Sequence, residues 1–526
     1  MKGAKALLET LVGAGVDTCF MNPGTSEMHS VAALDDVPAL RPVLALFEGV
    51  ATGAADGYGR MSERPAATLL HLGPGLGNGI ANLHNARRGR TPLVNIVGDH
   101  ATYHKRFDAP LESDIESLAS PVSSWYRWCP RPADVAADAA AAVRAALGPP
   151  GCVATLVLPA DVSWLDVDDD AVAAAAPAEL LKGVRRSPVH DDVVRAAASV
   201  LSSGEPAALL LGGSAVRRRP LLAASRVAER AGARLLAEPF PARLERGAGL
   251  PGVERLAYLG EFAMAQMAGL SHLLLVDARP PVSPFAYPGR PSALVPEGCR
   301  VHVLAGESDD AAEALEALAA ELGASSDGAR LLPPSRPPVP PGPLTPASVA
   351  AVIGDLLPEN AIVSDESITA GIHLSAATEG APPHDLLSLT GNSIGQGLPL
   401  ATGAAVACPD RPVLALEADG SAMYTIQALW TQAREGLDVT TVIYDNGSYA
   451  ILNMELNRVG AEAGGRRARA MLDLGSPDLR FVRISEGLGV PAVRVETTEE
   501  LSSAVSRALE EDGPHLVHAV LSRAGI

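Results

Sequence analysis

The chain has 526 residues and carries 42 Lys plus Arg against 61 Asp plus Glu, which gives a formal net charge of −19. This acidity argues against nucleic acid as the main partner, because phosphate binding needs a basic surface; no apolar run reaches the roughly 18 residues of a transmembrane helix. Hydrophobic residues make up 47% and charged residues 20%, so we expect globular domains, about three or four at this length.

The N-terminus and the cysteines favour a cytoplasmic protein. The N-terminal stretch does not have the layout of a signal peptide, because Glu9 and Thr10 interrupt its apolar run. The five cysteines lie far apart and form no Cys-x-x-Cys pair. We therefore expect a reducing, cytoplasmic environment.

Helical stretches alternate with short apolar runs from the start of the chain. Ala4–Ala14, which Gly15 ends, predicts the first helix, and Thr18–Met21 predicts the strand after it. Further strands are predicted at Thr68–Leu72, Leu93–Val97, Ala208–Leu211, Leu273–Val276, Val413–Leu416 and Val439–Tyr444. Apolar runs of this length are typical of strands buried on both faces, so the pattern predicts an α/β protein with parallel sheets.

Two segments divide the chain into candidate domains. Residues 164–190 combine an acidic run, an alanine run and a proline, and residues 331–346 are rich enough in proline to predict a semi-rigid linker. The expected domains are therefore residues 1–165, 190–330 and 345–526.

Two neighbouring predicted strands of the last domain end in loops that carry oxygen ligands. One strand runs into Ala418–Ser421 and the other into Asp445–Ser448, with a helix expected between them from residue 423 to 436. Open parallel sheets bind their ligands at the carboxyl ends of strands. The carboxylate of Asp419 and the amide oxygen of Asn446 suit Mg²⁺, and free N–H groups at a helix start favour a diphosphate.

This arrangement resembles the cofactor motif of thiamine diphosphate (ThDP) enzymes, which is Gly-Asp-Gly-Ser followed, after a helix and a strand, by Asn-Asn. Here Ala418 replaces the first Gly and Asp445 replaces the first Asn. The resemblance implies Mg²⁺ ligands at Asp419, Asn446 and the backbone carbonyl of Ser448, and diphosphate contacts at Gly420 and Ser421.

A second block surrounds Glu48, which lies in an apolar run at the end of a strand or the start of a helix. Alone, such a glutamate is explained by a favourable interaction with a helix N-terminus. ThDP enzymes, however, carry a glutamate ahead of a segment ending Ala-Asp-Gly-Tyr-Ala-Arg, and Ala55–Arg60 is similar to that segment. The resemblance implies that Glu48 contacts the aminopyrimidine of the cofactor and promotes loss of the C2 proton of its thiazolium ring. The ylid formed in this way would add to a 2-oxo acid, and loss of CO₂ from the adduct would leave an enamine.

Further segments resemble the benzoylformate decarboxylase branch of this family. Asn22–Glu27 is similar to its Asn-Pro-Gly-Ser-Asn-Glu loop, so Gly24 would contact the cofactor and Thr25 would replace a substrate-contacting Ser. His71, which opens the Gly-rich segment His71–Asn78, matches an active-site His that handles protons. The other implied cofactor contacts are the diphosphate-side hydroxyls of Ser367 and Thr369, the apolar wedge Ile394, and Tyr424 and Tyr449.

One departure concerns the middle domain, where that branch carries a second catalytic His. The corresponding segment Pro281–Pro288 contains none. His100, just after the strand at Leu93–Val97, is a candidate replacement in the active site, and His104 is a weaker one. A solvated loop is the alternative for both.

The resemblance implies three doubly wound parallel-sheet domains: pyrimidine-binding, middle and diphosphate-binding. It also implies a homodimer or homotetramer with active sites between subunits, and decarboxylation of a 2-oxo acid with release of an aldehyde. Acetolactate synthase-like transfer to a second carbonyl compound stays open, and a non-catalytic subunit is a further alternative. Some relatives bind FAD or ADP in the middle domain, but Gly73–Gly79 fails the dinucleotide fingerprint and no other segment reads as a strong one, so FAD is not supported and an NAD-dependent oxidoreductase is disfavoured.

Overall fold

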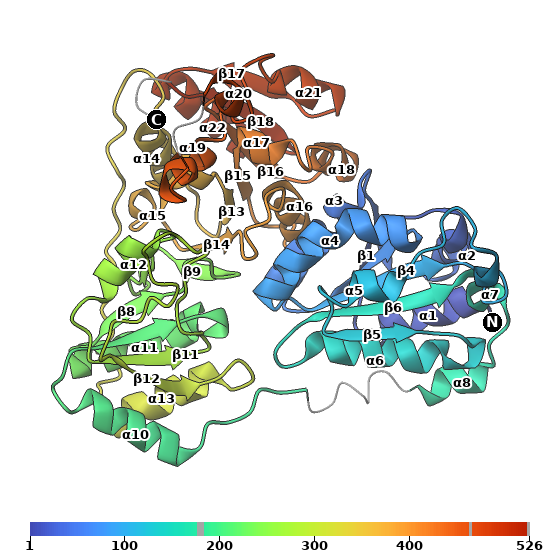
Figure 1. Cartoon of the computed structure of the whole chain (residues 1–526), viewed down its shortest axis with the longest axis horizontal. Helices are drawn as coiled ribbons and strands as arrows, with labels where there is room; N and C mark the ends of the chain where they lie inside the picture. The colour runs from blue at the N-terminus through green and yellow to red at the C-terminus, as the bar shows by residue number, and fades with distance from the viewer. Residues whose placement is uncertain (176–183, 462–464, 523–526) are drawn as a thin grey trace.

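The computed structural model describes residues 1–175, 184–461 and 465–522. It contains three sheets, each flanked by helices, in the N-terminal, middle and C-terminal parts of the chain (Figure 1). Every strand pair is parallel except one at the edge of the third sheet. The expected α/β class with three parallel-sheet domains is confirmed.

The N-terminal sheet has the strand order β2-β1-β3-β4-β6-β5. Its strands are β1 (Thr18–Asn22), β2 (Arg41–Leu44), β3 (Ala66–Leu70), β4 (Leu93–Asp99), β5 (Trp125–Trp128) and β6 (Val153–Pro159). Its helices are α1 (Gly3–Gly13), α2 (Met28–Ala33), α3 (Glu48–Ser62), α4 (Leu72–Gly89), α5 (Ile115–Ala119), α6 (Val135–Leu147), α7 (Ala160–Trp164) and α8 (Asp169–Ala174), with the short 3₁₀ helix η1 (Thr25–Glu27). Helices α3, α4 and α5 cover one face and α1 and α6 the other.

The middle sheet has the order β10-β8-β7-β11-β12. Its strands are β7 (Ala207–Leu211), β8 (Arg234–Ala237), β10 (Glu254–Arg255), β11 (His272–Val276) and β12 (Arg300–Ala305). Its helical segments are α10 (Asp191–Leu201), η5 (Gly213–Val216), α11 (Arg218–Ala231), α12 (Gly260–Met267) and α13 (Ala311–Glu321). From β7 the chain first builds the sheet toward β8 and then crosses to β11 on the other side, so β7 and β11 flank the point where the strand order reverses.

The C-terminal sheet has the order β17-β18-β16-β15-β13-β14-β9. Its parallel strands are β13 (Ile362–Glu366), β14 (His384–Ser388), β15 (Val413–Ala418), β16 (Val439–Asp445), β17 (Ala492–Val495) and β18 (His515–Val520). Its helices are α14 (Pro346–Leu356), α15 (Leu374–Ala377), α16 (Gly397–Ala407), α17 (Asp419–Ala422), α18 (Ala428–Glu435), α19 (Ala450–Arg458), α20 (Arg466–Ala470), α21 (Phe481–Gly487) and α22 (Thr498–Glu510). The last strand of the sheet, β9 (Leu244–Arg246), comes from the middle part of the chain and pairs antiparallel with β14.

Helices α3 and α16 join the N-terminal and C-terminal parts and share one hydrophobic core (Figure 1). Glycines let their backbones touch: a Cβ at Gly57 would lie 2.0 Å from the carbonyl oxygen of Leu400, and one at Gly403 would lie 1.8 Å from that of Ala54. A second core is shared by the middle and C-terminal parts. None of the helices in the described ranges is both long and apolar enough to cross a membrane.

The predicted strands are all present, with ends shifted by one or a few residues. The helix expected over residues 423–436 is wrong at its start, because the chain makes turns between α17 and α18, with the backbone N–H of Tyr424 donating to the carbonyl of Ser421 at 3.1 Å, and the helix begins only at Ala428. Part of the expected linker at 164–190 lies outside the described residues. The domain boundaries at 165, 190, 330 and 345 stay predictions, and β9 shows that the middle segment also supplies a strand to the C-terminal sheet.

Candidate active site

Glu48 is the first residue of α3, directly after the extended residue Phe47. Its side chain is almost buried, with 9% of the residue exposed, and Oε2 accepts a hydrogen bond from the Asn78 amide of α4 at 3.0 Å. A Cβ at Gly75 would lie 3.3 Å from Oε1, so the glycine leaves the second carboxylate oxygen room. The structure thus fixes one oxygen of Glu48 through α4.

His71 precedes α4 and forms a hydrogen bond with the buried carboxyl group of Glu27. Its Nδ1 lies 2.7 Å from Oε2 of Glu27, which also accepts from the backbone N–H of Gly24 at 2.7 Å. Burial raises the pKa of Glu27 in spite of these two partners. Gly24 and Gly98 make room for the pair: a Cβ at Gly24 would lie 2.4 Å from the His71 ring, and one at Gly98 would lie 1.6 Å from Oε1 of Glu27.

Glu27 is a further candidate site residue, because it contacts His71; sequence reasoning missed it and treated it only as the end of a loop motif. The signal available was its place in Asn22–Glu27, a segment that resembles an active-site loop. Thr25 begins η1 beside this pair and is exposed.

The carboxyl ends of β1, β3 and β4 lie at one edge of the N-terminal sheet, because these strands are neighbours and parallel. His71 follows β3 and His100 follows β4 at this edge. The Nε2 atom of His100 is buried and has no hydrogen-bond partner among the described residues. His104 packs on it, with ring centroids 5.4 Å apart. The structure therefore brings His100 to the expected edge of the sheet.

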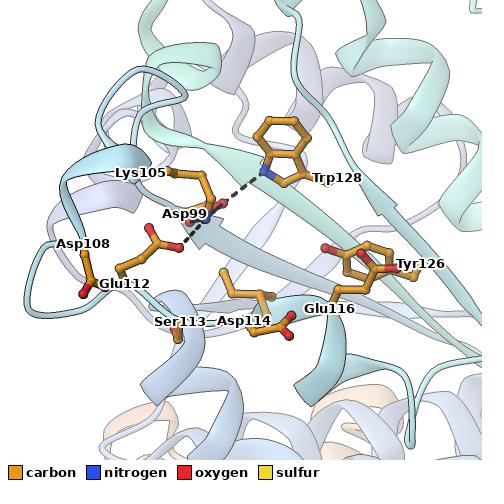
Figure 2. Close-up of a pocket in the computed structure, with 10 residues that line it drawn as sticks. Asp99, Lys105, Asp108, Glu112, Ser113, Asp114, Glu116, Tyr126 and Trp128 are labelled. Atoms are coloured by element: carbon orange, nitrogen blue, oxygen red, sulfur yellow. Dashed lines mark hydrogen bonds and ion pairs between the residues drawn. The ribbon is translucent and has the colours of Figure 1, made fainter.

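A cavity of about 500 Å³ opens beyond the end of β4 (Figure 2). Lys105 lines it, and its Nζ pairs with the carboxylates of Asp99 at 2.9 Å and Glu112 at 2.7 Å. The Trp128 indole N–H also donates to Asp99 at 3.0 Å. These bonds tie the loop after β4 to β5, next to the residues that follow β3.

Asp419 begins α17 and is buried, with 2% exposed. Its Oδ1 accepts from the backbone N–H of Gly420 at 2.8 Å, and its Oδ2 accepts from those of Asn446 and Gly447 at 3.2 and 2.8 Å. The side-chain oxygen of Asn446 accepts from the N–H of Ser448 at 2.9 Å. Strands β15 and β16 therefore bring all three expected metal ligands into one tight loop pair.

Asp445 adds a second carboxylate beside Asp419, and both accept from the N–H of Gly447. Burial and the neighbouring Asp445 raise the pKa of Asp419 to about 6. Burial alone would also raise the pKa of Asp445, but the bond to His518 Nε2 at 2.7 Å keeps it below its usual range. Asp419 has no ion pair with Lys or Arg among the described residues, and buried carboxylates beside amide oxygens fit a hard divalent cation.

No three His, Cys, Asp or Glu side chains converge as metal ligands in residues 1–175, 184–461 and 465–522. A cation at Asp419 would therefore also need the oxygens of Asn446, Ser448 and a bound diphosphate. The lack of a Cβ at Gly420 allows the ring of Tyr449 to lie against it, since that atom would fall 2.4 Å from the ring.

Two buried carboxyl groups support the segment around Ile394. Glu366 accepts from the backbone N–H of Gly395 at 2.6 Å and from that of Gly397. Both oxygens of Glu417 are buried without a hydrogen-bond partner among the described residues. Burial raises the pKa of both acids, and the charge of Glu366 raises that of Glu417 further. Neither acid was predicted as part of the site, because their meeting depends on how β13 and β15 pair.

The same segment is held from the other side by α4. The amide of Asn82 donates to the carbonyl of Gly395 at 3.1 Å, and that of Asn85 donates to the carbonyl of Ser393 at 2.8 Å. Ile394, between these contacts, is half-buried. The two asparagines of α4 therefore hold the backbone on both sides of Ile394.

The remaining predicted residues lie around this segment and the two loops. Ser367 is buried and its hydroxyl donates to Asp365 at 2.5 Å, whereas Thr369 is half-buried. Tyr424 is 53% exposed and packs on Gly395, where a Cβ would lie 2.6 Å from the Tyr424 side chain. Ser421 is buried at the start of α17. The structure thus gathers the C-terminal candidates in one region.

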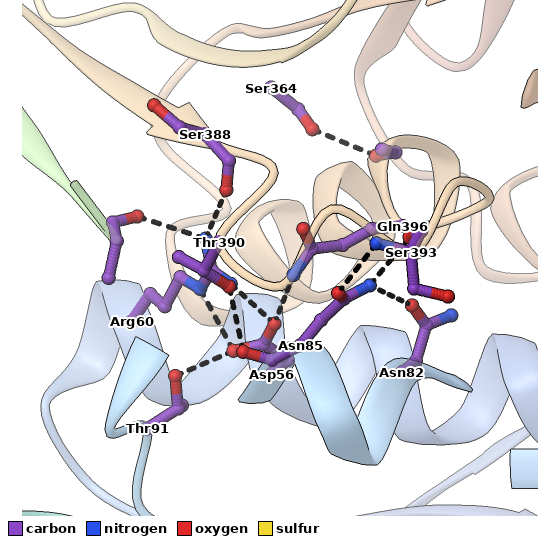
Figure 3. A network of polar contacts seen from close by, with 12 residues as sticks. Asp56, Arg60, Asn82, Asn85, Thr91, Ser364, Ser388, Thr390, Ser393 and Gln396 are labelled. Atoms are coloured by element: carbon purple, nitrogen blue, oxygen red, sulfur yellow. Dashed lines mark hydrogen bonds and ion pairs between the residues drawn. The ribbon is translucent and has the colours of Figure 1, made fainter. Parts of the chain in front are cut away.

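The Ala-Asp-Gly-Tyr-Gly-Arg segment in α3 forms a buried hub between all three parts of the chain (Figure 3). Arg60 pairs with Asp56 through two bonds of 2.8 and 2.7 Å, and both side chains are at most 1% exposed. Arg60 also donates to the carbonyls of Ala242 in the middle part and Ser388 in the C-terminal part. Asp56 accepts from Gln396 at 2.6 Å. This part of the motif therefore fixes how the domains meet.

Comparison with known proteins agrees with this geometry. The family profile described as thiamine pyrophosphate enzyme, N-terminal TPP binding domain, matches residues 1–118, and the corresponding C-terminal TPP binding domain matches residues 371–519. A Mycobacterium tuberculosis protein provisionally named acetolactate synthase large subunit IlvX is 59% identical over 522 residues, 99% of each chain. Benzoylformate decarboxylase of Pseudomonas aeruginosa is 31% identical over 548 residues, 97% of each chain.

Among solved structures, the thiamine diphosphate-dependent 4-hydroxybenzoylformate decarboxylase of Rhodococcus jostii RHA1 matches with a TM-score of 0.86. The match covers 100% of both chains at 25% identity. The chain therefore belongs to the thiamine pyrophosphate enzyme family, among its decarboxylases and acetolactate synthase-like members.

Proposed function

We propose that this chain catalyses the ThDP- and Mg²⁺-dependent decarboxylation of a 2-oxo acid with release of an aldehyde. The observation that carries the proposal is Glu48, buried at the start of α3 with one oxygen held by Asn78 and the other beside Gly75, where a side chain would crowd it. A carboxyl held in this way can contact a ring nitrogen and exchange a proton with it.

Each end of the cofactor has its own residues. Glu48 and Gly24 would contact the pyrimidine end, and Asp419, Asn446 and the carbonyl of Ser448 would hold Mg²⁺ at the diphosphate end. Gly420, Ser421, Ser367, Thr369 and Tyr449 would line the diphosphate end, and Tyr424 and Ile394 would lie against the rest of the cofactor. When bound, ThDP supplies a nucleophilic carbon and the electron sink that loss of CO₂ requires.

The Glu27–His71 pair would handle protons at the substrate. Glu27 fixes the Nδ1 side of the imidazole, so Nε2 is the nitrogen left to face a ligand. His71 is 21% exposed at its side chain, which leaves it access to a substrate. Thr25 would contact the substrate beside it, and His100 would serve as a second proton-transfer group at the same edge.

Carboligation of the acetolactate synthase type is the second candidate. The 59% identical relative carries that name, and the segment Pro281–Pro288 lacks the histidine that the decarboxylase branch uses. In this case the same residues would bind the cofactor, and a second carbonyl compound would take the place of the proton.

The active unit would be a homodimer or homotetramer in which the pyrimidine end and the diphosphate end of one ThDP are bound by different subunits. This can be tested by mixing two inactive variants, Glu48→Gln and Asp419→Ala. Subunit exchange would regenerate an intact site only if the two residues act on one cofactor from two chains, whereas a site within one chain would give no recovery.

The reaction can be identified with a panel of 2-oxo acids in the presence of ThDP and Mg²⁺. Aldehyde and CO₂ in equal amounts from the acid alone would support the decarboxylase. A hydroxyketone formed with an added carbonyl acceptor, without free aldehyde, would support the ligase. If no acid in the panel yields CO₂ while calorimetry shows bound ThDP, the non-catalytic alternative would replace both.

A further inference from the structure

The middle sheet has the switch point at which doubly wound folds bind ligands, and we call the place where the loops after β7 and β11 meet the switch-point crevice. The strand order reverses between β7 and β11, and ligands of such folds bind beyond the carboxyl ends of the strands at this point. Gly212 and Gly213 follow β7, and Asp277 follows β11. A phosphate at this point would need the free backbone N–H groups of the loop after β7.

Those N–H groups are already bonded to the chain's own carboxylates. Oδ2 of Asp277 accepts from the backbone N–H of Ser214 at 2.8 Å and from its hydroxyl at 2.7 Å. Glu238, which follows β8, accepts from the N–H of Gly213 at 3.1 Å. Two acids therefore occupy the position of an anion, and they would repel a diphosphate.

The cation with the shorter contact to Asp277 comes from the N-terminal domain. Arg90, directly after α4, forms an ion pair with Asp277 through Nη1 and donates from Nη2 to the carbonyl of Asp277 at 3.2 Å. Nη1 also lies 3.8 Å from Glu307. Asp277 is completely buried and the Arg90 side chain is 19% exposed.

The loop is shaped for this guanidinium group. A Cβ at Gly213 would lie 2.3 Å from Nη2 of Arg90 and 2.5 Å from Oδ2 of Asp277, so only a glycine lets the two meet. Arg186 contacts the same carboxylate, with its Nη1 3.4 Å from Oδ2 of Asp277, and donates to the carbonyls of Glu307 and Asp309 at 2.9 and 3.3 Å. A planar fork that donates to a carboxylate and a carbonyl together is a property of arginine, not of lysine.

We infer that the switch-point crevice of the middle domain is a guanidinium-binding site filled by Arg90, which docks the N-terminal domain at the position where related folds hold a nucleotide. The site is separate from the proposed active site and does not depend on ThDP. Because Arg90 directly follows α4, the crevice holds the helix that positions Asn78, Asn82 and Asn85.

Hydrogen exchange of the full-length apoprotein, followed by mass spectrometry, tests this inference. Arg90→Gln should speed exchange at η5 and at the end of α4 by about tenfold or more, since a hydrogen bond to a charged group contributes roughly 1.5–3 kcal/mol. Arg87→Gln, an exposed arginine near the same helix end, is the matched control and should change nothing. Equal exchange in Arg90→Gln and Arg87→Gln would overturn the docking role.

Small molecules test the chemistry of the crevice. Methylguanidinium should restore protection in Arg90→Gln, whereas methylammonium, a cation without the fork, should not. Arg90→Lys retains the charge and is the second variant should Arg90→Gln not fold; it should also lose protection at η5. Wild-type protection in Arg90→Lys, or protection of η5 by added ADP or FAD in the wild-type protein, would contradict a guanidinium site.

Discussion

Breaking the Asp56–Arg60 pair should destabilise the junction of the three domains. Arg60→Met leaves the Asp56 carboxylate buried with only the bonds from Thr91 and Gln396, both 2.6 Å long (Figure 3). Removing one partner of a buried pair costs about 3–5 kcal/mol, and the two remaining donors place this case at the lower end. Asp56→Asn leaves Arg60 with carbonyl and hydroxyl acceptors only, so we expect about 3 kcal/mol for each single variant.

The double variant separates the interaction between Asp56 and Arg60 from the cost of changing each residue alone. Because each single change leaves one uncompensated buried group, Asp56→Asn with Arg60→Met should cost much less than the sum of the two, by about 2 kcal/mol. Urea unfolding can be followed by tryptophan fluorescence. The signal reports on the N-terminal and C-terminal parts that the pair joins, because all four tryptophans lie outside residues 190–330.

The control is Arg64→Met, which breaks a largely exposed pair with Asp17 and should cost less than about 1 kcal/mol. Additive single costs, or a cost for Arg60→Met no larger than for Arg64→Met, would refute the assigned role of this hub.

Three other predictions follow from the site and the middle domain. Glu48→Gln should keep the fold and nearly abolish turnover; activity within about threefold of wild type would contradict its role, since a general acid–base group contributes roughly a hundredfold or more. Asp419→Ala should weaken ThDP binding in a Mg²⁺-dependent way, measured by calorimetry; unchanged binding would exclude it as a ligand. Burial raises the pKa of Glu238 from 4.5 to about 7, so the folded state binds its proton more tightly and its stability falls as pH rises from about 4.5 through 7. The full shift corresponds to about 3 kcal/mol, reduced by partial exposure; Glu238→Gln should flatten this pH dependence in thermal unfolding, whereas the exposed Glu297→Gln should not.

Local patterns were sufficient to predict the strands and the loops that carry the candidate site. Runs such as Val439–Tyr444 are buried because both faces of a parallel sheet are covered. A continuous apolar run of this kind can be recognised from the sequence alone. The same reasoning placed Asp419 and Asn446 at neighbouring strand ends, and β15 and β16 do pair.

Contacts between segments that are far apart in the sequence cannot be recognised in this way. Glu27 meets His71, and Glu366 meets the backbone at Gly395, only because helices and strands cross in a particular way. The helix expected at residue 423 begins only at Ala428, and in the turns before it the Thr425 hydroxyl bonds a distant group, the carbonyl of Gly395. Local propensity is a weak guide where tertiary contacts compete with it.

Strand β9 limits how modular this architecture can be. Three residues between two elements of the middle part complete the outer edge of another domain's sheet, pairing with β14 from His384 to Leu386. A shortened chain without the middle part would leave the backbone groups of β14 unpaired along an open edge, which is a template for aggregation. Any recombination of such domains, in the laboratory or in evolution, has to carry this short strand along or cover its place.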